Sequence, residues 1–235
     1  VGGPITLVGL GDEALGHFDL PEGGMANKYP EEPVIDGQFV WPGMIVLDED
    51  ENLYATDEAL HRINMWDKAG DFLGLWGEYG DAEGQLNRPS GMAFDSEQHL
   101  LVVDTQNHRV QKFTKDGKYI SGWGSRGAGE GEFEMPWGIV IDDEGFVYIG
   151  DWGNHRVQKL TADGEFVFEF GSFGTGDGEF DGPAGLDVDQ DGDIYVADRG
   201  NDRVQLFDYQ GRFVQKFLGD ATLSKTTVEY WLGGM

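Results

Sequence analysis

Four aspartate–arginine pairs and three histidines recur along the chain at one spacing. Each aspartate precedes its arginine by five residues, as Asp151 precedes Arg156, and the next pair follows 47 residues later. The pairs are Asp57–Arg62, Asp104–Arg109, Asp151–Arg156 and Asp198–Arg203. Three of these arginines directly follow a histidine, namely His61, His108 and His155. Carboxylate, guanidinium and imidazole groups can pair, transfer protons or bind a metal ion, so their placement decides which chemistry is open to them.

Whole segments repeat at the same spacing. Four prolines stand 47 residues apart without a gap: Pro42, Pro89, Pro136 and Pro183. Each is followed six residues later by an aspartate (Asp48, Asp95, Asp142, Asp189) and 28 residues later by a glycine (Gly70, Gly117, Gly164, Gly211). A fixed period of this length indicates that one local structure is built four times.

Each repeat predicts four short strands. In the third repeat they are approximately GIVID, FVYIGD, HRVQKL and EFVFEF, which are rich in β-branched and aromatic residues. The breaks between them are Asp-Glu-Gly, Trp-Gly-Asn and Ala-Asp-Gly, and Gly and Asn are residues that can adopt positive φ in tight turns. Four antiparallel strands in about 40–50 residues indicate one blade of an all-β propeller.

The repeated motif DxxNHRVQKF, followed by xxxGxF and FGxxGxGxGEF, resembles the NHL repeat, a blade-forming module of β-propellers. The resemblance covers roughly residues 39–219, and the first repeat departs most, with Leu60 where the others have Asn. NHL propellers commonly have six blades, so the resemblance implies that this chain is a fragment of a six-bladed ring. A five-bladed ring is the alternative, since five repeats of 47 residues match the length of 235 residues. The fifth blade would be incomplete, however, because the half blade at the start lacks two strands and the segment after the fourth repeat is long enough for only one.

We expect a single propeller domain over residues 1–235. Its parts are a half blade with a long acidic link (1–38), four full blades (39–85, 86–132, 133–179 and 180–219) and a tail (220–235). The half blade is a hairpin over residues 4–18, because that segment aligns with the third and fourth strands of a blade. The link is either a lid or a mobile acidic loop. Val228, Trp231 and Leu232 allow a short helix in residues 221–232.

The repeated charged residues are expected to be scaffold. An Asp–Arg pair that recurs in every blade serves every blade, as an ion pair or a backbone cap at the turn between the second and third strands. The histidines share one position in successive blades, which Asp202 takes in the fourth repeat. Equivalent positions of successive blades face different radial directions, so these histidines lie too far apart to bind one metal ion.

A binding site is expected where the repeats differ, on one rim of the channel. The turn between the second and third strands and the link between blades emerge on that rim. Two arginines there could hold a carboxylate, and two tryptophans of the third blade could line the pocket between them. The candidates are Trp41, Glu58, Arg88, Trp137, Trp152 and Arg199.

A weaker candidate is a calcium site in the segment DVDQDGD. Asp187, Asp189 and Asp191 fit the opening of a calcium-binding loop, although Asp189 has a counterpart in every repeat. No other metal or cofactor is expected.

The composition limits the partners. Asp plus Glu number 44 against 16 for Lys plus Arg, a formal net charge of −28, which disfavours nucleic acid and anionic membranes. The chain has no cysteine, so it has no disulfides or thiolate metal sites. No stretch approaches 18 apolar residues, so we expect a soluble protein, of undetermined compartment.

These observations favour a binding or scaffold module for a protein, a peptide or a small anionic ligand. The alternative is an enzyme, because the repeats also resemble those of peptidyl-hydroxyglycine α-amidating lyases, which are six-bladed zinc proteins. The segment from Asp57 to His61 reproduces the Asp-x-Ala-x-His context of one zinc ligand in that family. The other two ligands follow a proline directly, whereas here the prolines precede Gly43, Ser90, Trp137 and Ala184. We therefore do not expect zinc or lyase activity, and neither His17 nor His99 changes that expectation.

Overall fold

The structure is a computed structural model, and it describes residues 5–8, 14–18 and 37–218. The chain divides into two compact units, of which Ile35–Leu218 carries the blades. In the other unit, β1 (Ile5–Val8) pairs with β2 (Ala14–Phe18) as an antiparallel hairpin, as predicted for residues 4–18. The acidic link up to residue 36 and the helix allowed in residues 221–232 lie outside the described residues.

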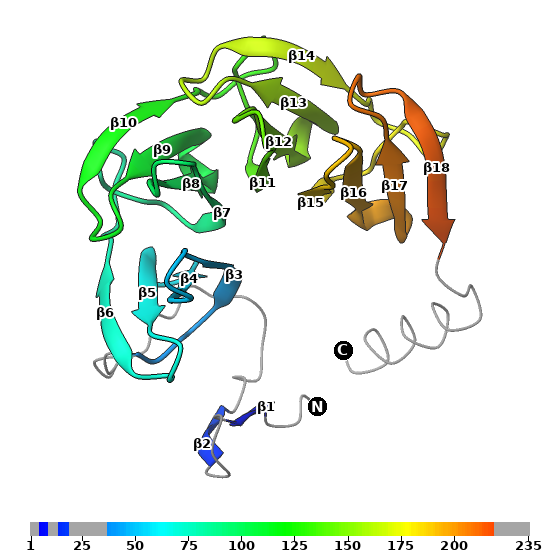
Figure 1. Cartoon of the computed structure of the whole chain (residues 1–235). Helices are drawn as coiled ribbons and strands as arrows, with labels where there is room; N and C mark the ends of the chain where they lie inside the picture. Colours follow the sequence, from blue (N-terminus) through cyan, green and yellow to red (C-terminus); the bar gives the residue numbers. More distant parts are fainter. Residues whose placement is uncertain (1–4, 9–13, 19–36, 219–235) are drawn as a thin grey trace. The chain divides into compact units, whose positions relative to one another are not determined.

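Ile35–Leu218 contains four sheets, each with four antiparallel strands in chain order (Figure 1). The first blade has β3 (Pro42–Leu47), β4 (Leu53–Asp57), β5 (Arg62–Trp66) and β6 (Phe72–Trp76). The second has β7 (Pro89–Phe94), β8 (Leu100–Asp104), β9 (Arg109–Phe113) and β10 (Tyr119–Trp123). The third has β11 (Pro136–Ile141), β12 (Val147–Asp151), β13 (Arg156–Leu160) and β14 (Phe166–Phe170), and the fourth has β15 (Pro183–Val188), β16 (Ile194–Asp198), β17 (Arg203–Phe207) and β18 (Phe213–Leu218). The predicted four-stranded antiparallel blades are confirmed.

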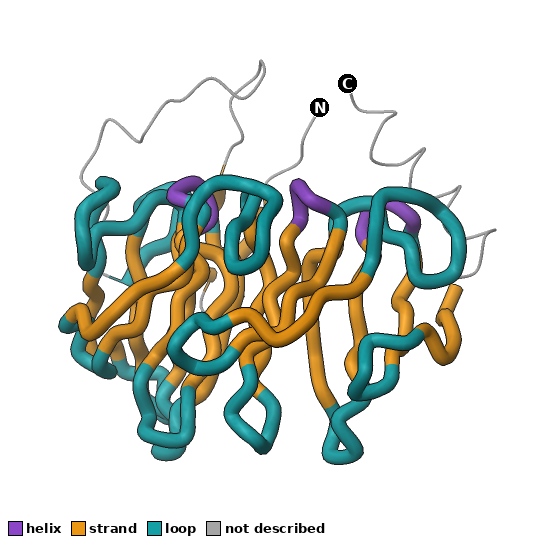
Figure 2. Tube along the Cα trace, turned by 90° about the horizontal axis from the view of Figure 1, so that it is seen from above, coloured by secondary structure: helices purple, strands orange, loops and turns teal. Residues whose placement is uncertain are grey.

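The turn between the second and third strands forms a short 3₁₀-helix in three blades. These are η1 (Thr105–Asn107), η2 (Trp152–Asn154) and η3 (Arg199–Asn201), and Figure 2 shows all three at the same edge of the blades. We call this edge, with the links that lead into each inner strand, the upper rim. Between residues 42 and 217 the structure has no longer helix, as predicted. Within the described part of the chain, no helix is long and apolar enough to cross a membrane.

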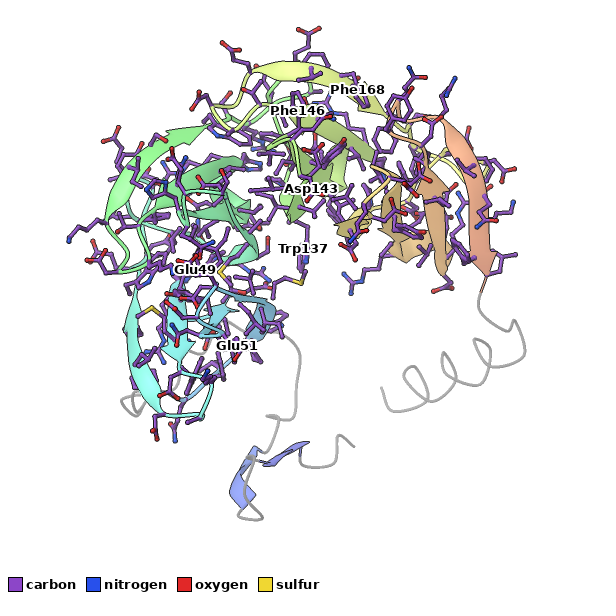
Figure 3. The ribbon with its side chains drawn as sticks, viewed as in Figure 1. Glu49, Glu51, Trp137, Asp143, Phe146 and Phe168 are labelled. Carbon is purple, nitrogen blue, oxygen red and sulfur yellow. The ribbon has the colours of Figure 1, made fainter. Side chains whose placement is uncertain are left out.

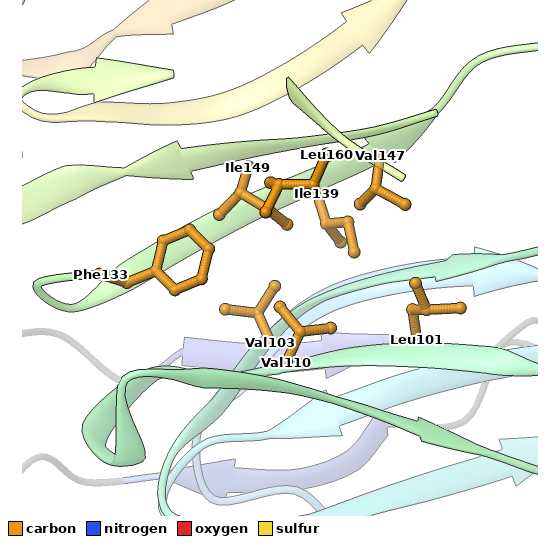
Figure 4. Close-up of a cluster of buried hydrophobic side chains, with 8 residues drawn as sticks. All are labelled: Leu101, Val103, Val110, Phe133, Ile139, Val147, Ile149 and Leu160. Carbon is orange, nitrogen blue, oxygen red and sulfur yellow. The ribbon is translucent and has the colours of Figure 1, made fainter. Parts of the chain in front are cut away.

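The hydrophobic cores lie between the blades. One core joins Leu101, Val103 and Val110 of the second blade to residues of the third (Figure 4). The third blade and the link before it contribute Phe133, Ile139, Val147, Ile149 and Leu160. Similar cores join the first blade to the second and the third to the fourth. A middle blade therefore buries both of its faces, which is why every residue of β8 and β12 is buried.

The innermost strands approach one another closely. A Cβ atom on Gly138 of β11 would lie 2.0 Å from the carbonyl oxygen of Ala184 in β15. A Cβ atom on Gly91 of β7 would lie 2.6 Å from the carbonyl oxygen of Trp137 in β11. Glycine at this position of the repeat therefore allows the blades to converge on their inner edges.

The Asp–Arg pairs are scaffold in the second, third and fourth blades. Arg156 donates through Nε to Asp151 at 2.9 Å, and its two terminal nitrogens donate to carbonyls of the link before the blade. The equivalent Asp–Arg bonds are 2.8 Å from Arg109 to Asp104 and 2.7 Å from Arg203 to Asp198. Each pair therefore ties a link to the turn that follows the second strand.

The first blade departs from this pattern. Among the described residues Arg62 makes no ion pair with Asp57, and it donates instead to the Gln38 carbonyl at 2.8 Å. The first blade therefore has the predicted backbone cap without the ion pair, since Asp57 accepts the amides of Val40, Trp41, Ala59 and Leu60. The first blade has Leu60 where the second has Asn107, whose amide donates to both the aspartate and the link.

Candidate functional site

The candidate residues lie on the upper rim because each turn after a second strand is bonded to the link of its own blade. The Glu58 amide donates to the Trp41 carbonyl at 3.0 Å in the first blade. In the third blade the Gly153 amide donates to the Glu134 carbonyl at 2.8 Å. The structure thereby brings the two sets of variable residues, from turns and from links, to the same rim (Figure 2).

Trp41, Glu58 and Arg88 form one cluster. The Arg88 guanidinium donates to Glu58 Oε2 at 2.9 Å, and its carbon lies 4.9 Å from the centre of the Trp41 ring. The Glu58 side chain is only 4% exposed. It fits because the residue beneath it is a glycine: a Cβ atom on Gly43 would lie 3.2 Å from Glu58 Oε1. Arg88 therefore has a fixed position between a buried carboxylate and an indole face.

The backbone of Arg88 is also held by the preceding blade. His61 Nδ1 accepts the Arg88 amide at 2.9 Å, and Arg88 has a φ of 55°. The same bond joins His108 to Met135 at 3.0 Å and His155 to Gly182 at 3.1 Å. The repeated histidines are thus scaffold between blades, as expected, and a positive φ at a residue such as Arg88 costs roughly 1 kcal/mol or more.

Burial and Arg88 have the largest effects on the charge of Glu58 in this cluster. Burial raises the pKa of Glu58, and Arg88 opposes that rise most strongly; the Arg199 charge also lowers the Glu58 pKa. Arg199 comes from the fourth blade, is exposed, and makes no ion pair within the described residues. Burial and the Arg88 charge lower the pKa of His61, which favours the neutral imidazole that accepts the amide.

The two tryptophans of the third blade occupy different places. Figure 3 shows Trp137 at the inner edge of the third blade, and its carbonyl accepts the Ser90 hydroxyl at 2.8 Å. Trp152, in the 3₁₀-helix of the third blade, packs against the link that leads into the fourth blade. A Cβ atom on Gly182 of that link would lie 2.3 Å from the indole nitrogen. The sequence indicated these two rings as neighbours of the arginines, but the ring that stacks on Arg88 is Trp41.

The calcium candidates do not converge. Asp189 Oδ1 accepts the amides of Asp191 and Asp193, both at 3.0 Å, so it caps the first turn of its blade. Asp187 accepts the neighbouring Val188 amide at 3.0 Å. In the described part of the chain, the one group of three metal-binding side chains within 4.8 Å of one another is Asp95, Glu97 and His99, which no sequence argument singled out.

Sequence comparison agrees with this architecture. The family model of the NHL repeat matches residues 86–113, 133–160 and 180–207, which lie in the second, third and fourth blades. No curated protein matches the sequence significantly.

Solved structures share the fold at low identity. Streptogramin B lyase has a TM-score of 0.57 and 18% identity, over 76% of this chain and 54% of that one. A catalytically inactive variant of virginiamycin B lyase from Staphylococcus aureus, solved with quinupristin, has a TM-score of 0.60 and 15% identity, over 93% and 64%. Hydrazine synthase from Kuenenia stuttgartiensis has a TM-score of 0.57 and 17% identity, over 80% and 52%. The chain spans about half to two thirds of the length of these three proteins.

Proposed function

Because this chain is an NHL-repeat β-propeller, we propose that it is a binding module whose ligand, a peptide or small molecule with a carboxylate, is held at the upper rim. The observation that supports this best is the placement of two arginines there, in a chain with a net charge of −28. Arginine binds a carboxylate through two parallel hydrogen bonds, so such residues select planar anions.

The two arginines have different roles in this proposal. Arg88 is already neutralised by Glu58 at 2.9 Å, so its remaining N–H groups are rigid donors and not a net charge. Arg199 is exposed and has no ion pair among the described residues, so it supplies the positive charge that attracts the ligand. Its charge is a minor influence on the Glu58 pKa, so the proposal of one site for both arginines rests on their common position on the upper rim.

The tryptophans would contact the apolar part of the ligand. Trp41 is exposed beside Arg88, and Trp137 lies at the inner edge of the third blade (Figure 3). Rigid aromatic rings with a few fixed polar groups are typical of sites that bind small molecules or peptides. An aromatic or aliphatic carboxylate therefore fits the rim best.

The propeller that was solved with quinupristin supports the idea that this fold carries ligands, without indicating which ligand binds here. We do not extend lyase activity to this chain. The histidines of the upper rim, His61, His108 and His155, each use Nδ1 to bind a different blade, so they do not converge on one metal ion.

The test is a titration of tryptophan fluorescence with N-acetyl-phenylalanine, with its uncharged amide as the matched ligand. We expect saturable quenching by the acid, and about tenfold weaker affinity in Arg199→Gln, because one charge-assisted contact is worth roughly 1.5–3 kcal/mol. Arg212→Gln is the control, since Arg212 is bound to Asp208 in a turn at the opposite end of the fourth blade. Equal binding of the amide, or an equal loss in the control, would contradict the proposal.

A further inference from the structure

The lower rim carries the turns between the first and second strands and between the third and fourth. At the seam between the first and second blades, one ammonium group on this rim lies among three carboxylates. Lys115 Nζ lies 3.3 Å from Asp48, 3.7 Å from Glu49 and 3.8 Å from Asp50. The lysine comes from the turn after β9, and the carboxylates come from the turn after β3. This seam shows how three carboxylates of the repeat hold a primary ammonium.

The seam between the third and fourth blades has the carboxylates without the lysine. Two repeats, or 94 residues, further along the chain, the turn after β11 has Asp142, Asp143 and Glu144 at the same positions. Tyr209 stands where Lys115 stands in the second blade. The repeat thus preserves the three carboxylates and replaces Lys115 by a tyrosine, while Lys159, which stands where the first blade has Met65, binds the first of the three, Asp142.

A second replacement opens the space. In the first seam, Gln98 Oε1 accepts the Glu49 amide at 3.2 Å and so closes the gap between two adjacent turns. The fourth blade has Gly192 at the position of Gln98, and glycine has no side chain to make this contact. This seam has a cleft of about 230 Å³. It is lined by Asp142, Asp143, Glu144, Tyr148, Lys159, Asp189, Gln190, Asp191, Gly192 and Tyr209.

Most of the acidic groups in this cleft make no ion pair with a described residue. Lys159 Nζ binds Asp142 at 3.2 Å and is itself buried, 4.1 Å from the centre of the Phe146 ring and 4.8 Å from that of Tyr148. It neutralises that one aspartate. The other four carboxylates of the lining make no ion pair with any described residue; Figure 3 shows Asp143 on the third blade and Glu49, its counterpart, on the first.

We propose that this cleft binds a primary ammonium group, on a free diamine or on a lysine side chain, in the place that Lys115 occupies in the first seam. The Tyr209 ring is 57% exposed and offers a face to the carbon chain of the ligand. The cleft is smaller than the roughly 300 Å³ of drug-sized sites, which suits one alkylammonium chain. This site is separate from the carboxylate site proposed above, because it lies on the other rim and has the opposite charge.

A calcium ion fits this cleft less well. Calcium needs about six to eight oxygen ligands at roughly 2.3–2.6 Å. Among the described residues no three carboxylates of this cleft have ligand atoms within 4.8 Å of one another, since the one such group lies elsewhere. An ammonium group tolerates the longer spacing, as Lys115 shows with contacts of 3.3–3.8 Å.

The experiment is calorimetry on the 235-residue chain at low ionic strength, with 1,5-diaminopentane, Nα-acetyl-lysine methylamide and calcium chloride as separate probes. We expect one molecule of diaminopentane per chain, and at least tenfold weaker binding in Tyr209→Lys, whose own ammonium takes the site. Ala162→Lys is the matched control, because it adds the same charge at the same repeat position of the third blade and should leave binding unchanged. Lys115→Ala should raise the stoichiometry to two by emptying the first seam.

The probes distinguish the sources of the ammonium group. Binding of diaminopentane alone supports a free diamine, and binding of both amines supports a lysine side chain as well. The proposal is overturned if neither amine binds, if calcium binds and the amines do not, or if Tyr209→Lys and Ala162→Lys weaken binding equally.

Discussion

Arg156→Ala should destabilise the protein more than the loss of any exposed arginine. The Arg156 side chain is 8% exposed and contacts five acceptors: two carboxylates and three backbone carbonyls. Alanine would leave Asp151, which is fully buried, without its cation. Burial already raises the pKa of Asp151, so its charge depends on this partner.

The magnitude follows from the buried ion pair. Removing one partner of such a pair costs about 3–5 kcal/mol, because the other charge stays buried without compensation. Arg126 is the matched reference, since it pairs with Glu134 at 3.0 Å but its side chain is 72% exposed. Breaking an exposed pair of this kind costs about 0–1 kcal/mol.

The assay is equilibrium unfolding in urea, followed by tryptophan fluorescence, for the parent chain, Arg156→Ala and Arg126→Ala. A third variant, Arg62→Ala, tests the exception in the first blade, where the arginine makes no pair with Asp57 among the described residues. We expect its cost to fall between those of the other two. If the free energies of unfolding of Arg156→Ala and Arg126→Ala differ by less than about 1 kcal/mol, the Asp–Arg pair does not have the scaffold role that we infer.

Three further outcomes follow from the site. Burial and the Arg88 charge hold the pKa of His61 below 6.5, so the stability that neutral His61 contributes is present above pH 6.5 and is lost as the pH falls toward the folded pKa. NMR titration should show the His61 pKa rising in Arg88→Gln. An unchanged pKa would contradict the influence of Arg88 on His61. Gly182→Ala should displace the Trp152 ring and strain a backbone with φ of 72°, which a lower melting temperature and a shifted Trp152 indole resonance would report. Metal analysis after dialysis should find no stoichiometric zinc; one zinc per chain, lost in His61→Ala, would instead favour the lyase alternative.

The architecture could be predicted because the repeat carries it. A 47-residue period with turn residues at fixed positions specifies four strands and their connections within each blade, and the structure has them. The scaffold role of His108 and Arg109 follows in the same way, since each lies at the same position in several blades. The first repeat departs from the others at Leu60, and it is also the blade in which the described residues show no Asp–Arg ion pair.

The contacts across the seams could not be predicted from that alignment. Glu58 and Arg88 bind each other from adjacent blades, 30 residues apart, whereas the alignment compares equivalent positions of the repeats. The cleft beside Tyr209 likewise depends on two replacements, at the positions of Lys115 and Gln98, whose partners lie in the preceding blade. A comparison of each turn with the link or turn of the next blade would have found both the Glu58–Arg88 contact and the cleft.

The most direct test of our central claim is an NMR map of the N-acetyl-phenylalanine site on the ¹⁵N-labelled chain. The claim is that the repeated residues are scaffold and that binding occurs on the upper rim, where the repeats differ. We predict that the indole resonances of Trp41 and Trp137 and the amides of Arg88 and Arg199 shift with one common dissociation constant. Shifts confined to the turns of the lower rim, or no saturable shift at these four residues, would contradict the claim.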